Sequence, residues 1–156
     1  VYQETSLVPT LTVMENIFMG RLPKKPGGLI NWKLVQSETE RLLKVMDVRI
    51  NPKSKIMHLP MWQRQVVEIC KALSQDPKVL ILDEPTKGVD VGAKAQIYEI
   101  IMDLVESGYG VILISSEMPE VISVSDRIAI MSNGRLAEIV NAQGITQERI
   151  LATAGA

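Results

Sequence analysis

Apolar positions recur with two different periods along the chain, and the change falls near residue 76. Residues 11–75 carry mostly helical spacing, whereas residues 77–156 carry short apolar runs of the strand type. Asn31 is a predicted N-cap. The helix after it has one apolar face, formed by Trp32, Val35, Leu42, Leu43 and Met46. A second helix is predicted from about Met61 to Ser74, and its apolar positions are Trp62, Val66, Ile69, Cys70 and Leu73.

The second half of the chain predicts a strand–helix–strand unit. Residues 79–82 and 111–114 are continuous apolar runs, as expected for strands buried on both faces. Asp90 is a predicted N-cap for the helix between them, which ends at Gly108. Such crossover units pair their strands in parallel. Asn133-Gly134 between two further apolar runs predicts a hairpin, and Thr146 is placed to cap a last short helix.

These patterns predict an α/β fold with a helical insertion, divided into residues 1–76 and residues 77–156. Residues near 5–60 are expected to form the helical part, with a flexible surface loop at 22–30. The 156 residues are enough for one ordinary domain with a core of its own.

Charge and composition remove several function classes. The 17 basic and 18 acidic residues give a net charge of −1, so the chain has no general attraction to nucleic acid. Cys70 and His58 are the only residues of their types, which excludes an internal disulfide and a Cys/His metal cluster. The apolar runs are far shorter than the roughly 20 residues of a membrane span. With no initiating methionine and no secretory signal, the chain is expected to begin inside a longer sequence.

Asp83 and Glu84 are the leading candidates for chemistry. They follow the apolar run 79–82, and ligands of open α/β sheets bind at the carboxyl ends of the strands. Asp83 at the strand tip can orient Mg²⁺ through the ion's waters. Glu84 is placed to polarise an attacking water. The alternative is that both carboxylates only cap the loop before Pro85.

The segment 82–86, Leu-Asp-Glu-Pro-Thr, resembles the extended Walker B motif of ABC ATPases. Gly88-Val89-Asp90 resembles the D-loop of these proteins, which meets the opposing subunit. Ser116 stands where the family has its switch histidine, so the usual imidazole contact is missing. Residues 83–94 together with 114–117 are similar to the second ATPase half of the ribose and galactose type of sugar importer. This resemblance implies a partial P-loop NTPase fold, with a mostly parallel sheet, a helical subdomain and a C-terminal β-hairpin.

Two segments nearer the N-terminus extend the resemblance. Residues 1–4 resemble the Q-loop, in which Gln3 would touch the magnesium and the attacking water; alternatively, Gln3 is simply a frayed terminal residue. Residues 59–65 stand where the family has its signature Leu-Ser-Gly-Gly-Gln, which contacts the nucleotide of the other subunit. The corresponding residues are Leu59, Pro60, Met61, Trp62 and Gln63. Proline lacks an N–H and tryptophan blocks close approach, so this signature is degenerate.

Such a divergent signature resembles the first ATPase half of the same importers. The first 76 residues thus resemble one half and the remainder resembles the other. A chain fused across the duplicated halves by an internal deletion would have this pattern.

No Gly-x-x-x-x-Gly-Lys-Ser/Thr motif occurs in the 156 residues. That loop provides the backbone N–H groups and the lysine that cradle phosphates. Losing three charge-assisted hydrogen bonds removes roughly 5–9 kcal/mol, comparable to the binding energy of a micromolar ligand. The chain alone is therefore expected to hydrolyse no ATP.

The resemblance implies the ATP-hydrolysing subunit of a sugar importer, with ATP and Mg²⁺ as cofactors. The implied partners are transmembrane permease subunits, a second ATPase half and, indirectly, a sugar-binding protein, at the cytoplasmic face of the cell membrane. The alternative function is a non-enzymatic module that binds a transmembrane or ATPase partner. Because the strand next to 111–115 in the family is missing, the chain is also expected to self-associate.

Overall fold

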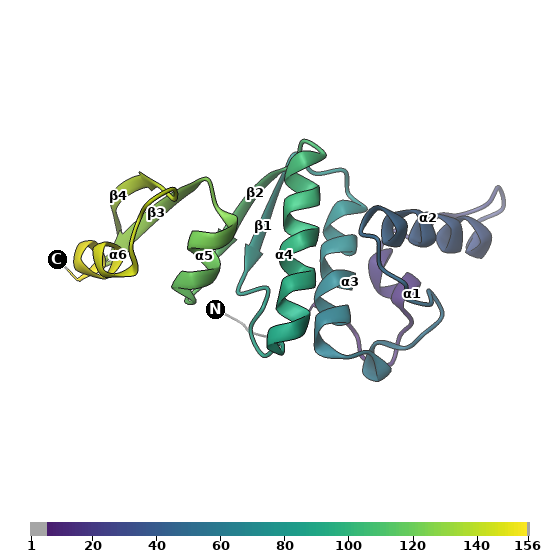
Figure 1. Cartoon of the computed structure of the whole chain (residues 1–156). Coiled ribbons are helices and arrows are strands. Elements are labelled where there is room, and N and C mark those ends of the chain that lie inside the picture. The colour runs from purple at the N-terminus through teal and green to yellow at the C-terminus, as the bar shows by residue number, and fades with distance from the viewer. Residues whose placement is uncertain (1–5, 156) are drawn as a thin grey trace. The chain divides into compact units, whose positions relative to one another are not determined.

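The computed structural model describes residues 6–155, and Figure 1 shows the order of the elements along the chain. Gln3 lies outside the described residues. The helices are α1 (Val13–Ile17), α2 (Trp32–Val45), the 3-10 helix η1 (Ile56–His58), α3 (Met61–Leu73), α4 (Val91–Glu106), α5 (Met118–Val124) and α6 (Gln147–Ala154). The strands are β1 (Val79–Asp83), β2 (Gly110–Ile114), β3 (Arg127–Ser132) and β4 (Arg135–Asn141).

The chain forms two compact units. The first comprises Val1–Leu80 and Thr86–Gly110, and the second comprises Ile81–Pro85 and Val111–Ala156. Each is described below by itself. The division at residue 76 stays a prediction.

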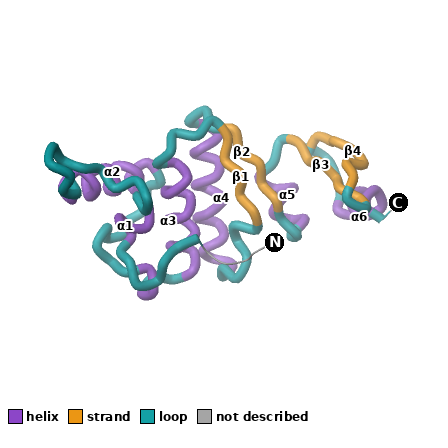
Figure 2. Tube along the Cα trace, turned by 180° about the vertical axis from the view of Figure 1, so that it is seen from behind, coloured by secondary structure: helices purple, strands orange, loops and turns teal. Residues whose placement is uncertain are grey.

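In the first unit, α3 packs against α1, α2 and α4 (Figures 1 and 2). The apolar faces predicted for the two helices are buried, and the fully buried side chains include Val13, Ile17, Val35, Val66, Val67, Ile97 and Ile101. Cys70 is buried as expected, and burial raises the pKa of its thiol to about 12. Trp62 is only partly buried, and the larger exception is Trp32, which remains 43% exposed. It begins α2, whose first turn projects beyond α1 and α3 (Figures 1 and 2).

The predicted helix starts are confirmed by their capping bonds. Oδ1 of Asn31 accepts the N–H of Leu34 at 3.3 Å, and Oδ1 of Asp90 accepts the N–H of Ala93 at 3.0 Å. These bonds satisfy backbone donors that a helix start leaves without an intrahelical partner. Thr146 caps α6 in the same way.

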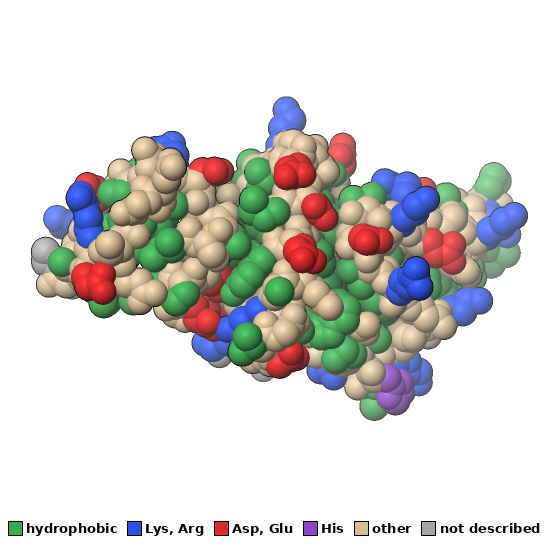
Figure 3. Space-filling model, viewed as in Figure 1, with side chains coloured by type: hydrophobic (Ala, Val, Ile, Leu, Met, Phe, Trp, Pro, Cys, Tyr) green, Lys and Arg blue, Asp and Glu red, His purple; other side chains and the backbone are tan. Residues whose placement is uncertain are grey.

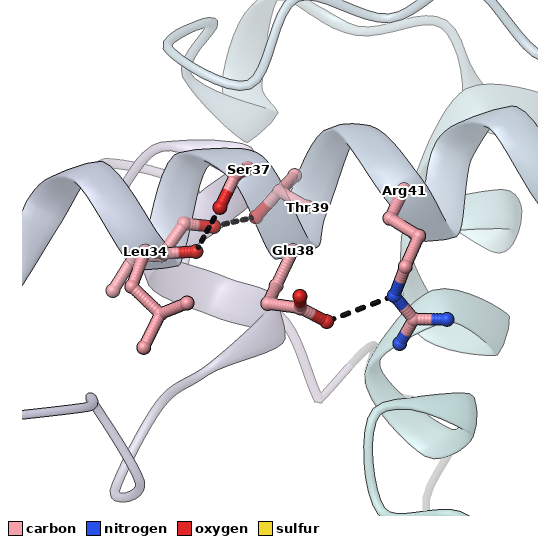
Figure 4. A network of polar contacts seen from close by, with 6 residues as sticks. Leu34, Ser37, Glu38, Thr39 and Arg41 are labelled. Atoms are coloured by element: carbon pink, nitrogen blue, oxygen red, sulfur yellow. Dashed lines mark hydrogen bonds and ion pairs between the residues drawn. The ribbon is translucent and has the colours of Figure 1, made fainter.

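Figure 4 shows polar contacts along α2, on its surface and toward the core. Glu38 and Arg41 form an ion pair at 2.9 Å, three residues apart on the helix. The buried hydroxyl of Thr39 donates to the carbonyl of Val35 at 2.8 Å. Thr39 therefore enters the core with its polar group satisfied by its own helix.

The segment predicted as a flexible loop at 22–30 is a short hairpin. The N–H of Lys25 donates to the carbonyl of Leu29 at 2.7 Å, and the N–H of Asn31 donates to that of Pro23 at 2.8 Å. Gly27 and Gly28 both have positive φ, at 101° and 85°, which glycine adopts without strain. Composition predicted a surface loop but could not predict the backbone bonds that close it into a hairpin.

Strands β1 and β2 form a two-stranded sheet. The N–H of Gly110 donates to the carbonyl of Lys78 at one end, and the N–H of Glu84 donates to that of Ile114 at the other. The start of β1 therefore lies beside the start of β2, and the end of β1 lies beside the end of β2. The two strands pair in parallel, as predicted. Burial on both faces, however, was a wrong expectation. Ile81 is 65% exposed and Ile112 is 51% exposed, because none of the described residues covers their face.

The hairpin β3–β4 forms a second, antiparallel sheet (Figure 2). Asn133 and Gly134 have φ of 49° and 75°, the left-handed values of a tight two-residue turn, so the predicted hairpin is confirmed. Ile128 and Ile130 of β3 pack with Ile150 of α6 in a small core within the second unit.

Candidate functional site

The two candidate carboxylates lie where the apolar run predicts them, at the carboxyl end of β1. Asp83 is the last residue of the strand and is exposed. Glu84 follows it with φ of 50°, a left-handed conformation that few residues other than glycine adopt. Its N–H donates to Ile114 at 2.8 Å, which fixes this backbone against the end of β2. Unusual backbone of this kind is often concentrated at functional sites.

The loop after β2 contacts the Glu84 side chain directly. The backbone N–H of Ser116 donates to Oε1 of Glu84 at 2.9 Å. Two candidates that lie 32 residues apart are therefore in contact within the second unit. The bond comes from the backbone of Ser116 and leaves its hydroxyl out, so the residue that replaces the expected histidine holds the carboxylate by its main chain.

A second pair of contacts holds this loop in place, and sequence analysis did not identify it. The hydroxyl of Ser115 donates to Oε2 of Glu120, a residue of α5 that is only 2% exposed. The same hydroxyl accepts the N–H of Glu117 at 3.0 Å. Ser115 therefore links the loop to a buried carboxylate immediately before the residue that contacts Glu84. A glutamate among apolar residues of a short helix was the only signal in the sequence.

The segment predicted to be a degenerate signature lies at the start of α3. Pro60 is its N-cap residue and makes no side-chain capping bond, and Met61, Trp62 and Gln63 form the first turn. Leu59 is buried, and its carbonyl accepts Nε of Arg64 at 2.9 Å. The structure thus places these residues at a helix start, a position suited to anions. Which of them contacts nucleotide stays a prediction.

Asp90 has the structural role predicted from its position before a helix, a role that the resemblance to the D-loop does not imply. Its carboxylate caps α4 through Ala93, as described above. A role at an opposing subunit stays a prediction for this residue.

The segment after Gln3 is held by α3. The N–H of Ser6 donates to Oε1 of Glu68 at 2.8 Å, and Nζ of Lys71 donates to the carbonyl of Ser6 at 2.9 Å. Burial raises the pKa of Glu68 above the ordinary carboxyl value of 4.5, partly offset by the bond from Ser6 and the charge of Lys71. The helix that begins at the signature segment thus also fixes the chain just beyond the predicted Q-loop. Sequence spacing gave no sign of this contact.

The described residues fit the implied cofactors only in part. Mg²⁺ at phosphate sites is held by one or two carboxylates and keeps several waters, and the exposed carboxylate of Asp83 suits that requirement. No group of three or more His, Cys, Asp or Glu among residues 6–155 is placed to hold a metal by itself. The fit to ATP is incomplete, because the sequence has no phosphate-binding loop to hold the phosphates.

Comparison with known proteins identifies the family of the chain. Residues 1–87 match the family described as ABC transporter. The chain belongs to this family. Asp83 and Glu84 lie within the residues that match the family, and Ser116 lies beyond them.

Three curated relatives are sugar import ATP-binding proteins. The chain is 39% identical over 151 residues to the xylose import ATP-binding protein of Thermoanaerobacter pseudethanolicus, covering 97% of this chain and 30% of that protein. It is 40% identical over 157 residues to the ribose import ATP-binding protein of Bacillus subtilis, covering 98% and 32%. It is 44% identical over 138 residues to the galactose/methyl galactoside import ATP-binding protein of Treponema pallidum, covering 87% and 28%. The chain therefore spans about a third of the length of these relatives.

Solved structures of ABC transporter cassettes share the fold. The ATP-binding cassette MJ1267 superposes with a TM-score of 0.78 at 20% identity, over 97% of this chain and 66% of that chain. The cassette MJ0796 in a post-hydrolysis state with ADP and phosphate gives a TM-score of 0.72 at 22% identity, over 93% and 62%. These likenesses confirm the predicted ABC ATPase fold. None of the helices in the described part of the chain is long and apolar enough to cross a membrane.

Proposed function

We propose that the chain is part of the ATP-hydrolysing subunit that powers sugar import by an ABC transporter. The observation that carries the proposal is the contact between Glu84 and Ser116. It holds a carboxylate at the end of a parallel strand. The Glu84 backbone N–H is bonded to Ile114 at the end of β2, and the Glu84 side chain is bonded to Ser116 in the loop after β2. The identity to sugar import ATP-binding proteins supports the substrate class.

In this proposal Glu84 acts as the group that polarises the attacking water. The bond from Ser116 engages Oε1, so Oε2 is the oxygen available to accept a water proton. Asp83 would hold Mg²⁺, which supplies charge neutralisation at the phosphates when bound. A fixed carboxylate lowers the cost of ordering the site during reaction. Gln3, which lies outside the described residues, would contact the magnesium and the attacking water.

The missing phosphate-binding loop sets a condition on this function. The loop must come from residues other than these 156. The further partners in this proposal are transmembrane permease subunits and, through them, a sugar-binding protein. The subunit would then lie peripherally at the cytoplasmic face of the cell membrane.

A second candidate function is a non-enzymatic interaction module. It is favoured by the absence of the phosphate-binding loop and by Pro60 and Trp62 in the signature segment. Such a module would bind a transmembrane or ATPase partner through its helical part and would leave Glu84 without a catalytic task.

Uptake of labelled sugar separates the two candidates. Cells carry the cognate permease and binding protein, and the ATPase polypeptide that contains this sequence is supplied as wild type, Glu84→Gln or Glu99→Gln. Xylose, ribose and galactose are the sugars to test, given the relatives. We expect Glu84→Gln to abolish uptake while the polypeptide still fractionates with membranes. Glu99 is exposed on α4 and serves as the matched control, with uptake unchanged.

Wild-type uptake by the Glu84→Gln variant would contradict the hydrolytic proposal and favour the interaction module. Loss of uptake in Glu99→Gln as well would show that the polypeptide tolerates no such change, and Glu84 would then have no specific part.

A further inference from the structure

Residues 23–34 form a projecting surface element, here called the basic tip. It consists of the hairpin closed by Lys25 and Leu29 and the first turn of α2. Figures 1 and 2 show this part of the chain extending away from α3 within the first unit. The turn of Gly27 and Gly28 carries no side chains, so nothing at its apex would keep another surface at a distance.

Large apolar side chains are exposed on the basic tip. Leu29 is 75% exposed, Trp32 is 43% exposed and Leu34 is 42% exposed. Exposing this apolar surface to water costs free energy that burial against another surface would recover. The hydrogen-bonded backbone around them shows that they are presented by ordered structure.

The charge of the basic tip is entirely positive. Lys24, Lys25 and Lys33 are exposed, and the sequence has no Asp or Glu between Glu15 and Glu38. None of the three lysines forms an ion pair with another described residue. Blue and green side chains lie together at the right-hand end of Figure 3, over the start of α2. A local excess of three positive charges stands out in a chain whose net charge is −1.

We propose that the basic tip binds the surface of an anionic lipid bilayer directly. Lysines attract the anionic headgroups, tryptophan is suited to the interface between water and hydrocarbon, and an exposed leucine can enter the acyl boundary. Charge complementarity favours lipid over a cytoplasmic loop of a permease, because such loops carry an excess of Lys and Arg and would repel the lysines. This contact goes beyond the proposed function, since it requires neither nucleotide nor permease.

Vesicle sedimentation tests the proposal on the purified full chain. Binding is measured to vesicles of phosphatidylcholine with a third of phosphatidylglycerol and to vesicles of phosphatidylcholine alone. We expect binding to the anionic vesicles only, and release as salt screens the charges. The double variant Lys24→Gln/Lys25→Gln should bind about 30-fold more weakly, which corresponds to two surface lysines. The control Lys53→Gln/Lys78→Gln removes the same charge from exposed residues outside the tip and should bind like wild type.

Fluorescence locates the contact. Lipids brominated in their acyl chains should quench tryptophan emission of the wild type, and Trp32→Phe should lose that quenching although Trp62 remains. Equal binding to both vesicle types, or no binding to either, would overturn the proposal. So would equal losses in the two lysine variants, quenching retained in Trp32→Phe, or binding to membranes only when they contain the permease.

Discussion

The backbone N–H of Ser116 lies 2.9 Å from Oε1 of Glu84 and donates to it, joining the ends of two parallel strands. The bond uses no serine side chain, so the loop after β2 can hold the carboxylate with any residue at 116 except proline, which lacks a backbone N–H. What matters is the path of the backbone. That path is set one residue earlier, where the hydroxyl of Ser115 is bonded to the buried Glu120.

Ser115 should therefore act as a positioning residue. Ser115→Ala removes a bond to a buried carboxylate, and a loss of about 1.4 kcal/mol in transition-state stabilisation lowers turnover roughly ten-fold. In the assembled importer we expect kcat for ATP hydrolysis to fall while KM for ATP stays unchanged. Ser115→Thr keeps the hydroxyl and should restore most of kcat. Equal losses in both variants would mean that Ser115 only fills space.

The isolated chain should have no measurable Mg²⁺-dependent ATPase activity. Its 156 residues contain no phosphate-binding loop, so the hydrogen bonds that cradle the phosphates are lacking. Phosphate release by the purified chain is the measurement, with Glu84→Gln as the control for contaminating enzymes. Turnover that disappears in Glu84→Gln would come from the chain itself and would contradict this prediction.

The chain should self-associate through the exposed face and edge of the β1–β2 sheet. Ile81 is 65% exposed and Ile114 is 49% exposed, and the hairpin β3–β4 forms its own sheet without pairing to β2. An unpaired apolar edge favours pairing with another chain. Size-exclusion chromatography with light scattering should show mass above the 17.3 kDa monomer, rising with concentration.

The double variant Ile81→Lys/Ile114→Lys should shift the chain toward monomer. Val91, which is 86% exposed at the start of α4, provides the control Val91→Lys, with association unchanged. A single 17.3 kDa species of the wild type at every concentration would show that the edge needs no partner.

Glu68 should make stability fall as pH rises. Burial raises the pKa of Glu68 in the folded chain above its ordinary value of 4.5, so between these two values the folded state binds more protons than the unfolded state. The free energy of unfolding therefore decreases with pH across that window. Glu68→Gln keeps an acceptor for Ser6 and removes the charge, so it should melt higher than wild type at neutral pH.

Well below pH 4.5 the difference between Glu68→Gln and wild type should disappear, since the carboxyl is then protonated in both states. Thermal melts followed by circular dichroism give the comparison. A variant that melts lower than wild type at neutral pH would show that the charge of Glu68, attracted by the charge of Lys71, is stabilising.

The sequence by itself determined the features whose causes are local. Asn31, Asp90 and Thr146 cap helices because a short polar side chain bonds to a backbone N–H three residues on. Asn133-Gly134 turns the chain because both residues tolerate left-handed backbone. Four apolar residues followed by Asp83 and Glu84 place two carboxylates at a strand end, and spacing alone sufficed for that.

Only the tertiary structure decided which distant groups meet and which faces are covered. Glu84 and Ser116 are 32 residues apart, and Ser6 and Glu68 are 62 apart, so each contact depends on how strands or helices pack. The exposed Ile81 belongs to a run whose pattern indicated burial on both faces. An apolar run indicates which side chains would be stabilised by burial. The segments that bury them lie elsewhere in the fold, so the local sequence cannot show whether those segments are present.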